Sequence, residues 1–163
     1  MINKTLKHPD TKSYQYVVSY LDSIGVSFRD IAEIALQNQE KYSNKPLNHY
    51  EEIVERVLHK RELLNHIMTM AFLDEADAEG WLPEPLRTII HNDLGTFGVD
   101  EGMALSGASI FGTLATTNYA YLDKTKPLKI GELDALETPS TFADDIIGMI
   151  ASAVIAHSVH QTA

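Results

Sequence analysis

The chain has 163 residues, about the size of one domain, and this length is sufficient to bury a hydrophobic core without covalent cross-links. It has no cysteine, which excludes disulfides and thiolate metal sites and leaves oxygen ligands as the expected metal chemistry. Thirteen basic and 23 acidic residues give a formal charge of −10, which disfavours binding to nucleic-acid phosphates and anionic membranes. We therefore expect a single domain over residues 1–163, located in the cytoplasm, with no nucleic-acid partner.

Neither the N-terminal segment nor the longest uncharged run has the sequence features of a membrane-targeting or membrane-spanning segment. The first 18 residues lack the apolar core and the small-residue cleavage site of a secretory signal. The longest uncharged run, Gly102–Leu122, is long enough to cross a bilayer, but hydroxyl and small side chains dilute its hydrophobicity. We predict no membrane span, while peripheral contact with a membrane stays open.

Helical periodicity begins close to the N-terminus. Apolar residues at helical spacing predict a first helix that stops at Gly25. Ser27 is then predicted as the N-cap of a second helix, which extends to about Tyr42. Asp30 supports this start because an acid at the third helical position can complete a capping box.

The middle of the chain predicts one long helix followed by a short one. Asn48 and Glu51 have the spacing of an N-cap and its third-position acid, and apolar residues keep helical period from Tyr50 to Phe72. This third helix is predicted to end by Gly80. Residues 82–90, with two prolines near their start, predict a short fourth helix.

The second half of the chain predicts two nearly uncharged helices. Val99–Leu122 has no polar stripe, which is typical of a helix that other helices surround. Residues 128–140 are predicted to be irregular, and a last helix is expected over Thr141–His160. No strand-like alternation occurs. The predicted fold is therefore all-α, with about six helices in a bundle around one buried central helix at about 99–122.

Three groups of charged residues lie at helix ends in this half. They are Asp100 with Glu101, Asp123 with Lys124 and Lys126, and Asp144 with Asp145. Acids in a first turn complement the helix dipole, and this alone could explain the first and third groups. Asp123 follows the opposite pattern, because a carboxylate at a helix C-terminus is unfavourable unless a lysine or a metal compensates it.

A magnesium-assisted phosphate site is the functional alternative to dipole capping. Magnesium prefers oxygen ligands and keeps several waters, so one or two carboxylates and a substrate phosphate would complete its coordination. The ion could polarise the phosphoryl oxygens or activate water, and adjacent lysines could hold the remaining phosphate charge. His91 and Asp93 lie close to the Asp-Glu pair in sequence and are further candidates for the site. Tyr119 and Tyr121 are expected to pack, and their hydroxyls need partners if they are buried.

The same segments resemble a known family. "VDEGMAL", "TNYAYLDKTKPLKI" and "FADDIIGMIASAV" are similar to three motifs of the phosphatidylglycerophosphatase A family, and they occur in the same order. Those motifs are an Asp-Glu pair that opens a helix, an Asp-x-x-Lys-Pro segment, and an Asp-Asp pair before an apolar helix. Over most of its length the chain resembles the soluble branch of that superfamily, the YutG-like or low-temperature-requirement C proteins.

This resemblance implies a magnesium-dependent phosphatase that hydrolyses a phosphomonoester such as phosphatidylglycerol phosphate. The implied substrates are phosphorylated small molecules or phospholipid head groups. The resemblance points to Asp100 and Glu101, Asp123 and Lys126, and Asp144 and Asp145, without saying which acid binds metal and which acts as base. We predict Asp123, Lys126, Asp144 and Asp145 as catalytic residues, and Asp100, Glu101, Asp123, Asp144 and Asp145 as metal ligands.

A continuous helix over Val99–Leu122 would separate Asp100 from Asp123 by about 34 Å, too far to share one metal. Three solutions stay open: a helix break at Gly107 or Gly112, two separate sites, or an antiparallel partner subunit. The alternative to an enzyme is a catalytically silent structural or regulatory oligomer that binds a divalent cation. We expect a homo-oligomer in either case, because two apolar helices need extensive cover.

Overall fold

The structure is a computed structural model that describes residues 10–136 and 140–160, and within these ranges it contains helices and no strand. The all-α prediction is confirmed, but the described residues form nine helices where about six were expected. The helices are α1 (Asp10–Ser23), α2 (Phe28–Gln39), α3 (Leu47–Val57), α4 (Arg61–Ala78), α5 (Leu86–His91), α6 (Val99–Ser109), α7 (Thr113–Thr125), α8 (Lys129–Asp134) and α9 (Ala143–His160).

The start of α2 forms as the sequence predicts. The Asp30 backbone N–H donates to Ser27 Oγ at 3.2 Å, and the Ser27 N–H donates to the Asp30 carboxylate at 2.7 Å. Both halves of a capping box are therefore present, and the two residues satisfy backbone donors that the helix leaves unpaired. Gly25, just before this cap, has φ +66°, which ends α1 where it was expected to end.

The long third helix was predicted wrongly, because the chain turns between α3 and α4. Lys60 has extended backbone angles, and Arg61 then makes a two-pronged ion pair with Asp10 at 2.7 and 2.9 Å, which joins the start of α4 to α1. The N-cap of α3 is Pro46, so Asn48 lies inside the helix. Apolar periodicity continues through the turn because both helices face one core, and it therefore hides the break.

The predicted helix over 99–122 is also two helices. Gly112 has φ +85° and ψ −176°, a combination that residues with a side chain rarely adopt, and it separates α6 from α7. The two helices then pack against each other. Gly107, the other candidate for a break, lies within α6 and is buried, where an added Cβ would clash with Met149.

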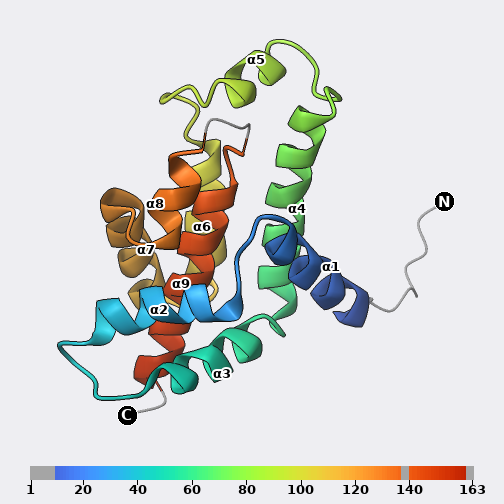
Figure 1. Ribbon diagram of the computed structural model, residues 1–163. Coiled ribbons are helices and arrows are strands. Elements are labelled where there is room, and N and C mark those ends of the chain that lie inside the picture. Colours follow the sequence, from blue (N-terminus) through green and yellow to red (C-terminus); the bar gives the residue numbers. More distant parts are fainter. Residues whose placement is uncertain (1–9, 137–139, 161–163) are drawn as a thin grey trace.

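The central helix of the bundle is α9, which corrects the expectation that residues 99–122 occupy this place. Fifteen of its 18 residues are buried, whereas only three residues of α7 are. The helices α2, α3, α4, α6, α7 and α8 all contact α9, which runs through the middle of the molecule (Figure 1). The absence of a polar stripe predicts burial both for residues 99–122 and for α9, so it does not say which of them is central. Of α7 and α9, α9 is the more hydrophobic.

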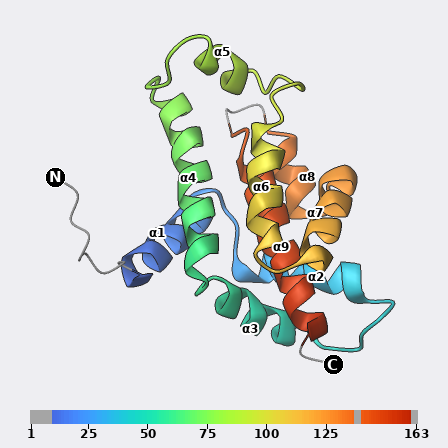
Figure 2. The same ribbon diagram turned by 180° about the vertical axis from the view of Figure 1, so that it is seen from behind.

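A short helix, α8, occupies part of the segment predicted to be irregular. Its Gly131 lies so close to the Lys126 carbonyl that a side chain would not fit between them. Residues 137–139 of the same segment lie outside the described residues. Viewed from behind, α6, α7 and α8 lie together along α9 (Figure 2). Within the described ranges, no helix is long and apolar enough to cross a membrane.

Candidate functional site

The break at Gly112 decides where the charged residues meet. Because α6 and α7 run in opposite directions, the N-terminus of α6 and the C-terminus of α7 lie at the same end of the bundle. The N-terminus of α9 lies at this end too, below α5 (Figures 1 and 2). All three sequence motifs therefore reach one region of a single chain, and no partner subunit is needed to bring them together.

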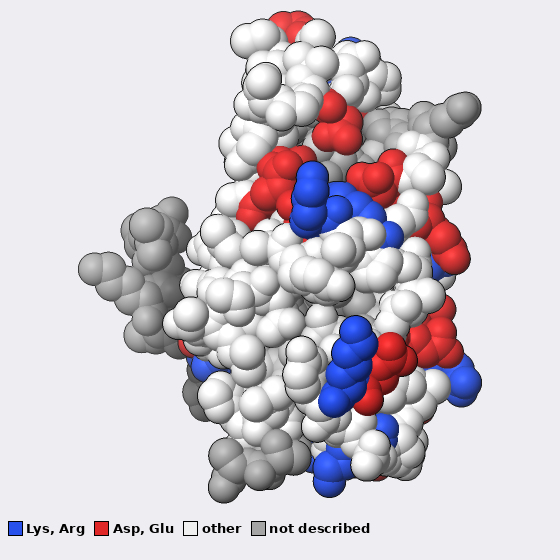
Figure 3. All heavy atoms as spheres, turned by 90° about the vertical axis from the view of Figure 1, so that its left-hand side faces the viewer, with Lys and Arg blue, Asp and Glu red and all other residues white. Residues whose placement is uncertain are grey.

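Lys126 lies at the centre of this region. Its ammonium group is 2.5 Å from Asp144 Oδ2, 3.1 Å from Asp123 Oδ1 and 3.4 Å from Asp134 Oδ1. Lys126 is also the C-cap of α7 and has a left-handed backbone, with φ +43°. Three helices thus supply carboxylates to one lysine, and we call these four residues the Lys126 cluster. Figure 3 shows acidic side chains to the left and right of a small basic group on one face of the molecule.

Burial and charge act in opposite directions on the two closest members of the cluster. Burial alone would lower the pKa of Lys126, but the hydrogen bond and the charge of Asp144 outweigh it and raise the pKa above its usual value. Burial raises the pKa of Asp144, and Lys126 offsets part of that rise. The side chain of Asp144 is only 8% exposed, so the lysine compensates a carboxylate that water reaches poorly.

Asp145 has a different partner from its neighbour Asp144. The buried hydroxyl of Tyr119 donates to Asp145 Oδ1 at 2.5 Å, which provides the partner that a buried tyrosine requires. Burial and the charge of Asp144 raise the pKa of Asp145 to about 7, against the lowering effect of Tyr119 and Lys126. The pKa of Tyr119 is raised by burial and by the charge of Asp145.

Asp100 and Glu101 belong to the same electrostatic region. Burial raises the pKa of Asp100 to about 8, and a side-chain hydrogen bond with Glu101 adds to this rise and lowers the pKa of Glu101. The charge of Asp145 acts on Asp100, and the charge of Lys126 acts on Glu101. Asp100 Oδ1 is buried and has no hydrogen-bond partner among the described residues.

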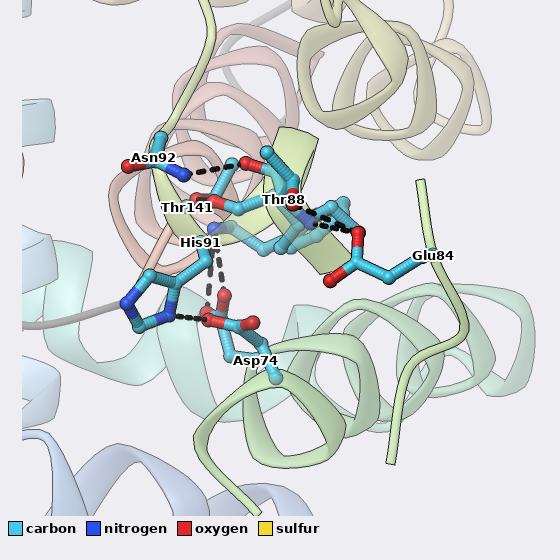
Figure 4. A network of polar contacts seen from close by, with 9 residues as sticks. Asp74, Glu84, Thr88, His91, Asn92 and Thr141 are labelled. Carbon is cyan, nitrogen blue, oxygen red and sulfur yellow. Dashed lines mark hydrogen bonds and ion pairs between the residues drawn. The ribbon is translucent and has the colours of Figure 1, made fainter. Parts of the chain in front are cut away.

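A second polar network lies beside the cluster, where α4, α5 and α9 meet (Figure 4). Asp74, on α4, accepts hydrogen bonds from the Phe142 backbone N–H at 3.1 and 3.3 Å. Thr141 Oγ1 donates to the Ile90 carbonyl at 2.7 Å, and His91 Nδ1 lies 3.1 Å from Asp77 Oδ2. Burial raises the pKa of Asp74 to about 7, and the charge of the nearby Asp144 adds to this rise.

The sequence analysis did not single out two acids of this region, Asp134 and Asp74. Asp134 was overlooked because its segment was expected to be irregular. Asp74 belongs to an acidic stretch that was taken for a helix end, although its spacing from Ile67 and Met70 places it on the buried face of α4. His91 pairs with Asp77, whereas Asp93 interacts electrostatically with Asp134, Glu101 and Lys126.

A groove in the described part of the chain lies elsewhere. It has a volume of about 890 Å³ and runs between the end of α2 and the outer face of α7. Its apolar and aromatic lining includes Tyr42, Leu114, Tyr121 and Pro127. None of the three acids that contact Lys126 lines it, so the groove is separate from the cluster.

The fold and the cluster together define an all-helical protein with a lysine–carboxylate centre at one end of its bundle. The model of the phosphatidylglycerophosphatase A (PgpA) family matches residues 20–160, and the chain therefore belongs to this family. The matched range includes all three motifs on which the resemblance was based.

Individual relatives agree with this assignment. YpjQ, an uncharacterized protein of Bacillus subtilis (strain 168), is 40% identical over 144 residues, which cover 86% of this chain and 80% of YpjQ. Its crystal structure superposes with a TM-score of 0.90 at 36% identity, over 95% of this chain and 98% of that one. YutG, an uncharacterized protein of the same organism, is 39% identical over 140 residues, which cover 84% of each chain.

The chain is also similar to a low-temperature-requirement C protein, a member of the branch that the sequence motifs indicated. The crystal structure of the low temperature requirement C protein of Listeria monocytogenes has a TM-score of 0.88 and 38% identity. The superposition covers 92% of this chain and 96% of that protein.

Proposed function

We propose that this protein is a magnesium-dependent phosphatase that hydrolyses a phosphomonoester, such as the terminal phosphate of a phosphatidylglycerol phosphate head group. Family membership supports the reaction class. The observation that carries the proposal is the convergence of all three motifs on Lys126, which contacts Asp144 and Asp123 directly and interacts with Glu101 electrostatically.

The residues present fit a magnesium ion in charge and in chemistry. Burial raises the pKa of Asp100, Asp144 and Asp145, and Lys126 offsets only part of this rise at Asp144 and Asp145, so a further positive charge would stabilise these carboxylates. Asp100 Oδ1 is a buried oxygen in need of a partner. Among the described residues, no group of three or more histidine or acidic side chains is already arranged to hold a metal ion.

In this proposal Asp123, Asp144 and Asp145 would supply ligands to the ion, and Asp100 and Glu101 are further candidate ligands. When bound, magnesium would polarise the phosphoryl oxygens or lower the pKa of a water. The chain's own residues supply the rest of the site. Tyr119 fixes the orientation of Asp145 through its hydrogen bond, because a buried carboxylate with a rigid donor cannot rotate freely.

Lys126 is proposed to bind the phosphate. Its ammonium group now neutralises several acids, and its side chain is 29% exposed, so it remains within reach of a ligand. A phosphate dianion would compete with Asp123 and Asp134 for its three N–H donors. The lysine would thereby supply a local positive charge for the anionic substrate on a chain whose formal charge is −10.

The test is turnover of a generic phosphomonoester with and without Mg²⁺, in the wild type and in Asp123→Asn and Asp144→Asn. We expect magnesium-dependent release of phosphate and a loss of about 100-fold or more in the variants, the scale on which catalytic electrostatic groups act. Asp22→Asn, an exposed substitution distant in sequence from the cluster, is the matched control. Equal activity in all four proteins would refute the site, and no activity in any of them would favour a catalytically silent, cation-binding oligomer.

A further inference from the structure

The N-terminus of α9 is capped by a residue from another helix. Phe142 is the N-cap residue, because its carbonyl accepts the first helical hydrogen bond, from Ile146 N at 2.9 Å. The backbone N–H of Phe142 donates to both carboxylate oxygens of Asp74, which lies 68 residues earlier on α4. The side chain that serves this N–H therefore comes from a distant part of the chain.

In a local capping box this task belongs to the third residue of the helix. The α2 helix follows that rule, since Asp30 occupies the third position and accepts from the N–H of its own N-cap residue, Ser27. The third residue of α9 is Asp145, an acid with the same carboxylate group. Asp145 accepts instead from the Tyr119 hydroxyl, and it lies among the charges around Lys126.

We propose that Asp74 is a positioning residue, which occupies the Phe142 N–H and so leaves Asp145 free to bond Tyr119 and to serve the site. The positioning role rests on the proposed function, whereas the exchange of hydrogen-bond partners does not. Without Asp74, Asp145 could rotate toward the Phe142 N–H, as Asp30 does in α2. The reacting region would then lose one correctly oriented carboxylate.

The environment of Asp74 supports a role beyond stability. The residue is buried, with 9% of its surface exposed, and it lies close enough to Asp144 for their charges to repel. Burying a carboxylate near like charges is unfavourable, and a neutral cap would serve the helix with less cost. Asp74 is absent from the three family motifs, so sequence similarity gave no indication of it.

The experiment compares Asp74→Ala, which removes the acceptor, with Asp74→Asn, which keeps an acceptor oxygen and removes the charge. Asp30→Ala is the control, because it breaks the capping box of α2 and leaves α9 untouched. NMR follows the backbone ¹⁵N–H of Phe142, the carboxyl ¹³C of Asp145, and the hydroxyl proton of Tyr119, which Tyr119→Phe assigns. Steady-state kinetics with a phosphomonoester and Mg²⁺ provides kcat and KM separately.

In Asp74→Ala we expect the Tyr119 hydroxyl resonance to disappear and the Asp145 carboxyl resonance to move. We also expect kcat to fall about tenfold or more, with KM changed by less than about threefold, because orientation is lost and binding is kept. Asp74→Asn should restore both signals and most of kcat. Asp30→Ala should lower thermal stability and leave the Tyr119 signal and kcat unchanged.

Two results would overturn the inference. The first is an Asp74→Ala protein that keeps the Tyr119 resonance and the wild-type kcat. The second is an Asp74→Asn protein that loses that resonance. If Asp74→Ala does not fold, the resonance of Asp74→Asn alone tests the inference. A wild-type protein without phosphatase activity would contradict the proposed function alone, since the NMR measurements test the partner exchange independently of turnover.

Discussion

Lys126 and Asp144 are 18 residues apart in sequence, and their charged groups are 2.5 Å apart in the structure. The lysine ends α7 and the aspartate begins α9, so the ion pair links the two helices at one end of the bundle. Asp144 is almost fully buried, and its pairing with Lys126 is therefore a structural requirement as well as a feature of the proposed site.

Replacing Lys126 by methionine should destabilise the protein. The change keeps most of the apolar stem and leaves Asp144 buried without its cation, a defect that costs about 3 kcal/mol in comparable sites. Lys124→Met is the matched control, because Lys124 is exposed in the same helix turn and its loss should change stability by less than about 0.5 kcal/mol. Urea unfolding provides both values, and equal midpoints would show that the ion pair contributes nothing.

Stability should decrease as the pH rises. The folded-state pKa of Asp74 and of Asp145 is raised from 3.8 to about 7 in each case, so the native protein binds more protons than the unfolded chain between these values. The free energy of unfolding therefore falls from about pH 4 to pH 7, and the raised pKa of Asp100, about 8, extends the fall to about pH 8. Calorimetry at pH 5.5 and pH 8, in a buffer free of divalent ions, should find the higher melting temperature at pH 5.5.

The same linkage predicts the effect of Asp74→Asn on stability. At pH 8 the substitution removes a buried charge and should stabilise the protein by up to about 4 kcal/mol, the equivalent of three pKa units. At pH 4 the wild-type carboxyl is largely protonated, and the two proteins should be nearly equal. A stabilisation that is the same at both pH values would mean that the charge of Asp74 is not its cause.

Magnesium should raise the melting temperature at pH 8 more than at pH 5.5. The ion would bind ionised carboxylates of the folded state, and a free concentration of 100 times Kd adds about 2.7 kcal/mol of stability. Asp144→Asn should abolish this increase, whereas Asp22→Asn should keep it. Differential scanning fluorimetry across a magnesium titration measures both, and an identical response of the two variants would argue against the proposed ligands.

Gly112 and Gly102 should respond to alanine in opposite directions. Gly112→Ala places a side chain at φ +85° and should cost about 1–3 kcal/mol, because the break between α6 and α7 needs this backbone conformation. Gly102 lies inside α6 with open space around it, and Gly102→Ala should stabilise by up to about 1 kcal/mol. Chemical denaturation of the two variants, measured side by side, compares the same chemical change in two backbone settings.

Self-association remains a prediction, and the structure changes its physical basis. Other helices of the same chain cover α9, so the apolar surface that needs cover is on α6 and α7, where Leu105 and Tyr121 are 43% and 58% exposed. Light scattering at micromolar concentration should find a species larger than a monomer of 18.2 kDa. Tyr121→Glu should shift the equilibrium toward the monomer. If both the wild type and Tyr121→Glu are monomers, the prediction of self-association is wrong.

The sequence alone determined the fold class and the family, and its motifs named most of the residues proposed for the site. Helical periodicity and the Ser27–Asp30 capping box depend on residues a few positions apart, and such local relations can be read without coordinates. The three motifs likewise named Asp123, Lys126 and Asp144, which the fold brings into contact. A motif resemblance can therefore predict which residues belong to one site, although it does not explain how the fold brings them together.

Only the tertiary structure decided which helix is central and which acids lie together. An apolar run without a polar stripe predicts burial, but it does not say which of two such helices the others surround. The break at Gly112 and the approach of Asp74 and Asp134 depend on packing between segments far apart in sequence. Hydrophobic periodicity indicates only which face of a single helix is buried. The positions of side chains where α4, α7, α8 and α9 meet depend on how these four helices pack against one another.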